Sequence, residues 1–89
     1  MDWSRGDNMI PKVVSIDIVD QYILNIRFSN DVVKLFDVGK LLSDSRFEAL
    51  KNKALFYNVQ VDAGGYGISW NDDIDLSEYE LWTKGTPIN

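Results

Sequence analysis

The sequence predicts an α+β fold: an antiparallel sheet of about five strands, made of a three-strand meander, a helix and then a hairpin, with a short C-terminal helix. Three observations predict this fold. Apolar and polar residues alternate along three successive segments between residues 12 and 38, which is the period of half-buried strands. A capping-box pattern at Ser45 and a second one at Ser77 then indicate two helix starts.

The length of 89 residues fits one domain. We expect residues 1–9 to form a flexible leader, residues 10–86 the single α+β domain, and residues 87–89 a tail. The leader contains Arg5-Gly6-Asp7, the adhesion tripeptide, but three residues recur by chance and nothing else indicates a secreted adhesive protein.

The first predicted strand follows Lys12. Its alternation predicts that three apolar side chains share one face while Ser15 and Asp17 point the other way; the three are Val14, Ile16 and Ile18. Asp20-Gln21 supplies the residues for a turn into the second strand.

The second strand places large apolar side chains on one face and Asn25 and Arg27 on the other; the apolar ones are Tyr22, Leu24, Ile26 and Phe28. Ser29, Asn30 and Asp31 form the next turn. The third strand spans residues 32–38 and carries apolar residues on both faces, so we expect both faces to be partly covered and the strand not to be a fully exposed edge.

Two helical segments and a hairpin fill the middle of the chain. Asp37 is expected to cap a short turn that holds Leu41 and Leu42, and Ser45-x-x-Glu48 to open a helix with Phe47, Leu50 and Ala54 on one face. Asn52-Lys53 is expected to break this helix. Residues 58–62 and 66–70 then flank Ala-Gly-Gly, which predicts two strands joined by a glycine hairpin.

Residues 67–82, "GISWNDDIDLSEYELW", hold five carboxylates and two tryptophans without a basic residue. Ser77-x-x-Glu80 predicts a helix over about residues 78–84, with Lys84 in its last turn and Gly85 as its C-terminal glycine. Asp75 and Glu78 then lie at the positive end of the helix dipole. This interpretation leaves Asp72 and Asp73 without a structural role.

Two chemical interpretations of the same acids are weaker. A calcium loop would need a turn glycine and a glutamate at its twelfth position, and the segment has neither. A carboxylate pair for glycoside hydrolysis would need a substrate cleft, for which a chain of 89 residues has little material. The chain also has no cysteine and no histidine, which removes thiolate sites, imidazole ligands and Ser-His-Asp triads. We therefore expect no enzyme, no catalytic residue, no metal ligand and no cofactor.

The tryptophans are open to two interpretations: core residues that close the helix over the sheet, or exposed anchors for a partner. The candidate interaction residues are Trp70, Asp72, Asp73, Glu78 and Trp82. A candidate ligand pocket consists of Tyr66, Trp70 and Trp82.

The net charge of -5 is uneven, because residues 1–66 carry eight basic and nine acidic side chains while residues 67–89 carry one and five. This balance disfavours direct nucleic-acid binding, which depends on lysine and arginine, and favours a basic protein partner. No apolar run reaches the roughly 20 residues that span a bilayer, so we expect a cytoplasmic protein without membrane contact. The oligomeric state leaves no mark on the sequence.

Two runs resemble a small bacterial family called domain of unknown function 2442: "YILNIRFSNDVVKLFDVGKLL" and "FEALKNKALFYNVQVDAGGYGISWNDDIDLSEYELWTKG". The family's features fall on Phe28, Phe36-Asp37, Phe47, Leu50, Phe56, Val59, Val61, Ile68, Trp70, Asp75-Leu76 and Trp82. Two positions depart from its pattern, since Asp31 stands where a turn glycine is usual and Asn71 where a proline is common.

The resemblance implies a compact α+β domain with an antiparallel sheet and no established catalytic residues. Members of the family that the chain resembles occur alone, fused to a C-terminal helix-turn-helix domain, or encoded beside another small protein in arrangements that suggest toxin-antitoxin pairs. The resemblance implies one of these settings for this chain. The first hypothesis is therefore a non-enzymatic protein-interaction module, an antitoxin-like or accessory member of a two-gene pair. The alternatives are a small-ligand sensor domain and an acidic nucleic-acid mimic that acts as an inhibitor.

Overall fold

The computed structural model describes residues 10–88 and contains two antiparallel sheets, with the strand orders β1-β2-β3-β7 and β4-β5-β6. The first sheet consists of β1 (Val13–Asp20), β2 (Ile23–Phe28), β3 (Val33–Asp37) and β7 (Thr86–Pro87). The second consists of β4 (Gln60–Val61), β5 (Gly67–Ser69) and β6 (Asp75–Ser77). The α-helices are α1 (Lys53–Phe56) and α2 (Glu78–Lys84), and short 3-10 helices span Val38–Leu41, Glu48–Lys51 and Ala63–Gly65.

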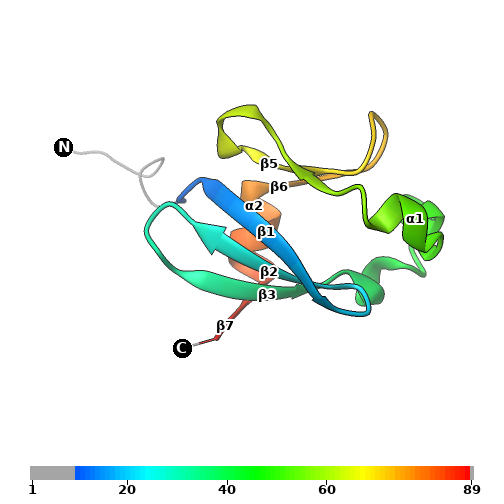
Figure 1. The fold of residues 1–89 in the computed structure, drawn as a ribbon, viewed down its shortest axis with the longest axis horizontal. Helices are drawn as coiled ribbons and strands as arrows, with labels where there is room; N and C mark the ends of the chain where they lie inside the picture. The colour runs from blue at the N-terminus through cyan, green and yellow to red at the C-terminus, as the bar shows by residue number, and fades with distance from the viewer. Residues whose placement is uncertain (1–9, 89) are drawn as a thin grey trace.

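The predicted α+β class is confirmed, but the prediction of one sheet is wrong. The β4–β5 hairpin pairs with β6 and not with the meander, so it forms a second sheet. In Figure 1, α2 lies behind β1 and β2, and the second sheet lies beside the first. The strands β6 and β7 were absent from the prediction because segments of three and two residues are too short to show a period.

The predicted meander β1–β2–β3 is confirmed. Leu24, Ile26 and Phe28 are fully buried on one face of β2, as their alternation predicts. β3 pairs with β2 on one side and with β7 on the other, so the prediction that it is not a fully exposed edge is confirmed. Pro87, the first residue of the predicted tail, belongs to β7.

β1 departs from its predicted face at one end. A register shift between Val13 and Ser15 turns Val13 into the core and leaves Val14 exposed, whereas Ile16 and Ile18 pair with β2 residues of the buried face. A second shift follows Ile18. A bulge inserts one residue on one strand, so strict alternation cannot be continued across it.

The prediction that Ser45 caps a helix is wrong. Asp44, not Ser45, accepts the nearby backbone hydrogen bond, from the Arg46 N–H at 2.9 Å. The segment contains two short helices, Glu48–Lys51 and α1, one on each side of Asn52, so the predicted break there is confirmed. The Asn52 side chain accepts a hydrogen bond from the Ala54 N–H and caps the start of α1. Ala54, which the sequence predicts on the apolar face, is exposed.

The predicted C-terminal helix is confirmed as α2, Glu78–Lys84. Ser77 Oγ accepts from the Glu80 N–H at 3.2 Å, but the Glu80 carboxylate pairs with Lys84 Nζ at 2.9 Å, so only half of the capping box forms. Gly85 ends the helix in an extended conformation (φ −72°). Glycine is needed at this position because a Cβ on residue 85 would clash with the Leu81 carbonyl oxygen, which the backbone approaches closely.

Lys34 of β3 joins α2 to the first sheet. This lysine is 9 % exposed, its Nζ lies 3.6 Å from the centroid of the Trp82 ring, and it donates a hydrogen bond to the Trp82 carbonyl. The carbonyls near the end of a helix carry partial negative charge, which favours a cation there. The largest fully buried side chains of the described residues are Leu24, Ile26, Phe28, Val38, Leu50, Phe56, Ile68 and Leu81.

Candidate functional site

The loop between β5 and β6, residues Asn71–Asp73, is called the acidic loop. Its backbone is held by the Asn71 side chain, whose Oδ1 accepts from the N–H groups of Asp73 (2.8 Å) and Ile74 (2.9 Å). The backbone N–H of Trp70 also donates a hydrogen bond to the Ile74 carbonyl at 3.0 Å, which closes the loop. An Asn side chain that accepts a hydrogen bond from the backbone N–H two residues further on forms an Asx-turn, which gives the loop a defined shape.

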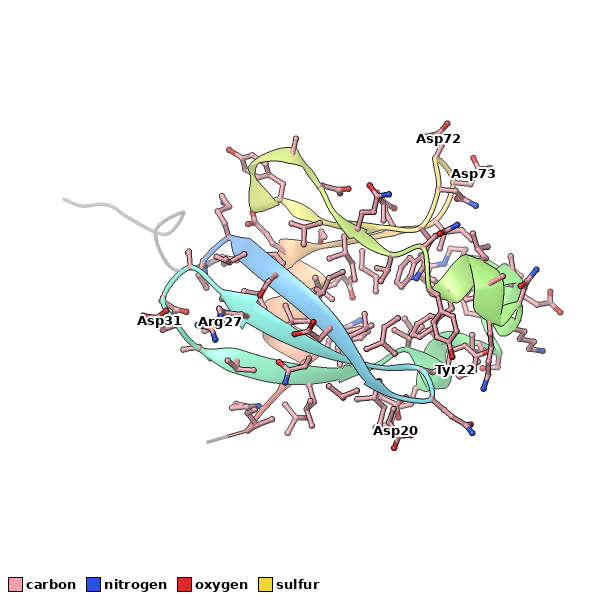
Figure 2. All side chains as sticks on the ribbon, viewed as in Figure 1. Asp20, Tyr22, Arg27, Asp31, Asp72 and Asp73 are labelled. Atoms are coloured by element: carbon pink, nitrogen blue, oxygen red, sulfur yellow. The ribbon has the colours of Figure 1, made fainter. Side chains whose placement is uncertain are left out.

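The two aspartates of the acidic loop are exposed and lie at the tip of the β5–β6 hairpin (Figure 2). Within residues 10–88, neither the Asp72 nor the Asp73 carboxylate forms a hydrogen bond or an ion pair, and the same holds for the exposed Asp75 on β6. One short hairpin therefore presents three carboxylates that no cation of the described chain neutralises.

Trp70 belongs to the core. It is 5 % exposed, its indole Nε1 donates to the Phe56 carbonyl at 3.1 Å, and its ring stacks near Phe56 with centroids 6.3 Å apart. A side chain this buried has almost no surface to offer a partner. Of its two interpretations, the structure supports the core residue and not the interaction anchor.

The three residues of the predicted pocket contact different parts of the molecule. Trp82 is half-buried and meets Phe28 edge to face, with ring centroids 5.0 Å apart. Tyr66 is 62 % exposed, and Lys12 Nζ lies 4.5 Å from its ring centroid. The described residues show no ring contact between any two of Tyr66, Trp70 and Trp82, so the structure does not bring these three together.

Glu78, the remaining candidate, is used inside the fold. Its Oε1 lies 2.9 Å from Lys12 Nζ, and its side chain is only 17 % exposed. This ion pair ties the segment before β1 to the start of α2. Because its charge is already paired and largely covered, Glu78 is a poor source of attraction for a partner.

A hollow of about 440 Å³, the loop hollow, opens beside the acidic loop. Its lining includes the carboxylates of Asp73 and Asp75, the guanidinium-bearing Arg46, and the largely buried Phe47 and Ile74. No local pattern in the sequence indicates this hollow, since Arg46 and Phe47 come from a segment far from the acidic loop in the chain. The fold brings Arg46 and Phe47 next to Asp73 and Asp75, although the two segments are far apart in the sequence.

Arg46 does not neutralise these aspartates. Its guanidinium binds Asp44 through two nitrogens, with Nη2–Oδ2 at 2.8 Å and Nε–Oδ2 at 3.2 Å. This hydrogen bonding lowers the pKa of the Asp44 carboxyl and raises the pKa of Arg46. Within residues 10–88, Arg46 thus forms its ion pair with Asp44, and neither Asp73 nor Asp75 forms an ion pair.

The described residues contain no group of three or more side chains that could hold a metal ion, and none of their helices has the length and apolar character to cross a bilayer. A family model described as "Protein of unknown function (DUF2442)" matches residues 13–87. These limits are the first residue of β1 and the last of β7, so the match spans both sheets and confirms the resemblance. The chain matches no curated protein and no solved structure.

Proposed function

The chain belongs to the DUF2442 family, and we propose that it is a non-enzymatic interaction module that binds a basic protein partner through its acidic loop. One observation carries the proposal: Asp72 and Asp73 are exposed on a loop whose backbone Asn71 holds in shape, and neither carboxylate is paired within residues 10–88. Structural roles account for the other strong candidates, Trp70 and Glu78.

Electrostatics favours a basic partner over other classes. Asp72, Asp73 and Asp75 lie on one hairpin, so their fields add over the Debye length of about 8 Å at physiological ionic strength. Such a patch speeds the encounter with lysine- and arginine-rich surfaces and repels the phosphates of nucleic acid. The net charge of -5 acts in the same direction.

The biological setting that fits this module is an antitoxin-like or accessory member of a two-gene pair, with the partner encoded beside it. A reducing cytoplasmic location agrees with a chain that has no cysteine. A sensor role has less support, because the aromatic residues that would line its pocket lie apart.

A charge-reversal experiment in the cells that encode the protein tests the proposal. We compare the tagged wild type with Asp72→Lys/Asp73→Lys and with the control Asp17→Lys/Asp20→Lys, which changes the net charge equally on exposed β1 positions; Figure 2 shows Asp20 far from Asp72. We expect the acidic-loop variant to recover at least about tenfold less of a specific basic partner, equivalent to about 1.4 kcal/mol.

The control should recover the partner as the wild type does, and binding should weaken as salt is added. Circular dichroism verifies that both variants are folded. Equal losses in the two variants, undiminished recovery with the acidic-loop variant, or a specific partner that is itself acidic would each contradict the proposal.

A further inference from the structure

Three neighbouring hollows share lining residues and are together called the lateral groove. The loop hollow shares Arg46, Phe47 and Asp75 with a smaller hollow of about 140 Å³. That hollow in turn shares Leu41 and Lys84 with a third hollow of about 200 Å³. Because neighbouring hollows share lining residues, they lie next to one another between the acidic loop and the edge of the first sheet.

The walls of the lateral groove come from separate segments of the chain. The segment between β3 and α1 contributes Leu41, Phe47 and Ala49, while β6 and α2 contribute residues such as Leu76 and Lys84. Phe47 and Leu76 belong to the core and are 5 % and 6 % exposed, so the apolar surface of the groove comes mainly from the half-buried Ile23, Leu35 and Leu41. Apolar side chains of a bound segment can bury surface here, which is the main source of affinity in most protein interfaces.

The charges of the lateral groove are distributed unevenly along it. In its middle, Arg46 pairs with Asp44 at 2.8 Å and Lys84 pairs with Glu80 at 2.9 Å. The far end is lined by Lys40 together with Asp37, which is of opposite charge. At the end formed by the acidic loop and β6, Asp73 and Asp75 form no ion pair within residues 10–88, because the nearby Arg46 pairs with Asp44.

We infer that the lateral groove binds a segment of the partner protein that lays apolar side chains along its floor and places a lysine or arginine beside Asp73 and Asp75. This inference rests on the proposed function, to which it adds where the partner is seated and which side chains recognise it. Charge complementarity at the loop end selects the basic residue, and the three adjacent hollows favour a chain segment over a small molecule that would fill only one of them.

A pair of matched substitutions separates seating in the groove from attraction to the loop. Ala49 is exposed and lines the loop hollow, so Ala49→Trp fills the hollow without altering any charge. Ala54 is an exposed alanine of α1 that lines none of the three hollows, so Ala54→Trp is the control. The charge variant is Asp73→Lys/Asp75→Lys, with Asp17→Lys/Asp20→Lys as its control.

The probe is a displayed library of random peptides selected on the wild-type protein, with affinities of the enriched peptides measured by fluorescence anisotropy. We expect enriched peptides to combine apolar residues with lysine or arginine. Their affinity should fall at least about tenfold for Ala49→Trp and for Asp73→Lys/Asp75→Lys, and should be unchanged for the two controls. Amide chemical shifts of the wild type should move in residues 46–49 and 73–76, which tests the site even if a variant fails to fold.

The inference is wrong if no peptide is enriched, if enriched peptides are acidic, if the controls bind as weakly as the groove variants, or if the shifts map to another face. Its failure can be told from that of the proposed function. If Ala49→Trp still recovers the cellular partner while Asp72→Lys/Asp73→Lys does not, the loop binds the partner and the groove does not. If neither change reduces recovery, both proposals are wrong.

Discussion

The strands β1, β2 and β3 of the first sheet are eight, six and five residues long, whereas the strands β4, β5 and β6 of the second sheet have two or three residues each. The longer strands form extended hydrogen-bond ladders and bury a continuous apolar face that includes Leu24, Ile26 and Phe28. Two or three paired residues cannot supply comparable stability, since even an isolated two-stranded hairpin is marginal in water.

The second sheet relies instead on individual side chains. Trp70 Nε1 bonds the Phe56 carbonyl, Ser69 Oγ donates to Asp62 Oδ1 at 2.7 Å, and Asn71 holds the acidic loop. Gly67 lets β6 approach closely, because a Cβ there would meet the Leu76 carbonyl oxygen. The first sheet is thus supported by many similar contacts, and the second, which carries the candidate site, by a few specific ones.

Loss of Trp70 should lower the stability of the protein more than any other single change in the second sheet. Trp70→Ala removes a buried aromatic side chain and leaves the Phe56 carbonyl unpaired, which should lower the free energy of unfolding by about 3–5 kcal/mol. For a domain of this size, with roughly 0.05–0.15 kcal/mol per residue, that is a large part of the total. Urea unfolding followed by circular dichroism measures the loss.

Trp70→Phe and Trp82→Phe make the test selective. The first keeps a ring but loses the buried hydrogen bond, so we expect a cost of about 1–3 kcal/mol. The second changes a half-buried ring whose indole N–H has no hydrogen bond within residues 10–88, and we expect less. An equal or greater loss for Trp82→Phe would show that the second sheet does not depend on the Trp70 hydrogen bond.

Asparagine-to-alanine changes in the two hairpins give an intermediate effect. Asn71→Ala removes the acceptor of two backbone N–H groups in a short hairpin, so stability should fall by about 1 kcal/mol. Asn30→Ala removes one such bond, to the Val32 N–H, between strands of six and five residues, and should cost less.

Native-state hydrogen exchange locates the effect of these two changes. We expect amides of β5 and β6 to exchange faster in Asn71→Ala, while amides of β2 and β3 stay protected in Asn30→Ala, because local opening is easiest where few contacts hold an element. Uniform acceleration over the whole chain in Asn71→Ala would mean that the two sheets unfold as one unit.

The same contrast between the sheets explains how much of the fold could be predicted. The meander followed from alternation along β2 and β3, and α2 from Ser77 and Lys84 at its ends, because those signals are local in the sequence. The bulge at Val14, the short strand β6 and the division into two sheets depend on pairing between distant segments, and local patterns carry no record of it.

The candidate site divides along the same line. Asp72 and Asp73 could be singled out because no nearby sequence pattern accounts for their carboxylates. The ion pair of Lys12 with Glu78, the burial of Trp70 and the hollow beside Phe47 each join residues far apart in the chain. Composition identified where charge is concentrated, and only the fold shows which of those charges are free within the described residues.

Asp31→Gly should have the smallest effect and the opposite sign. Asp31 adopts a left-handed conformation (φ 69°) in the β2–β3 turn, where glycine avoids the Cβ strain that other residues incur. Asp31 tolerates this region better than most residues, and glycine gains entropy in the unfolded chain, so the free energy of unfolding should rise by only about 0.5 kcal/mol.

Thermal unfolding measures this change in stability. Asp31→Ala, which keeps the strain without a local hydrogen-bonding side chain, should destabilise the protein. The competing contribution is the ion pair with Arg27, whose atoms are 4.0 Å apart on largely exposed side chains and which should therefore contribute little. A loss of stability in Asp31→Gly that disappears at high salt would assign the larger role to that ion pair and place a specific side-chain contact at the turn of the first sheet as well.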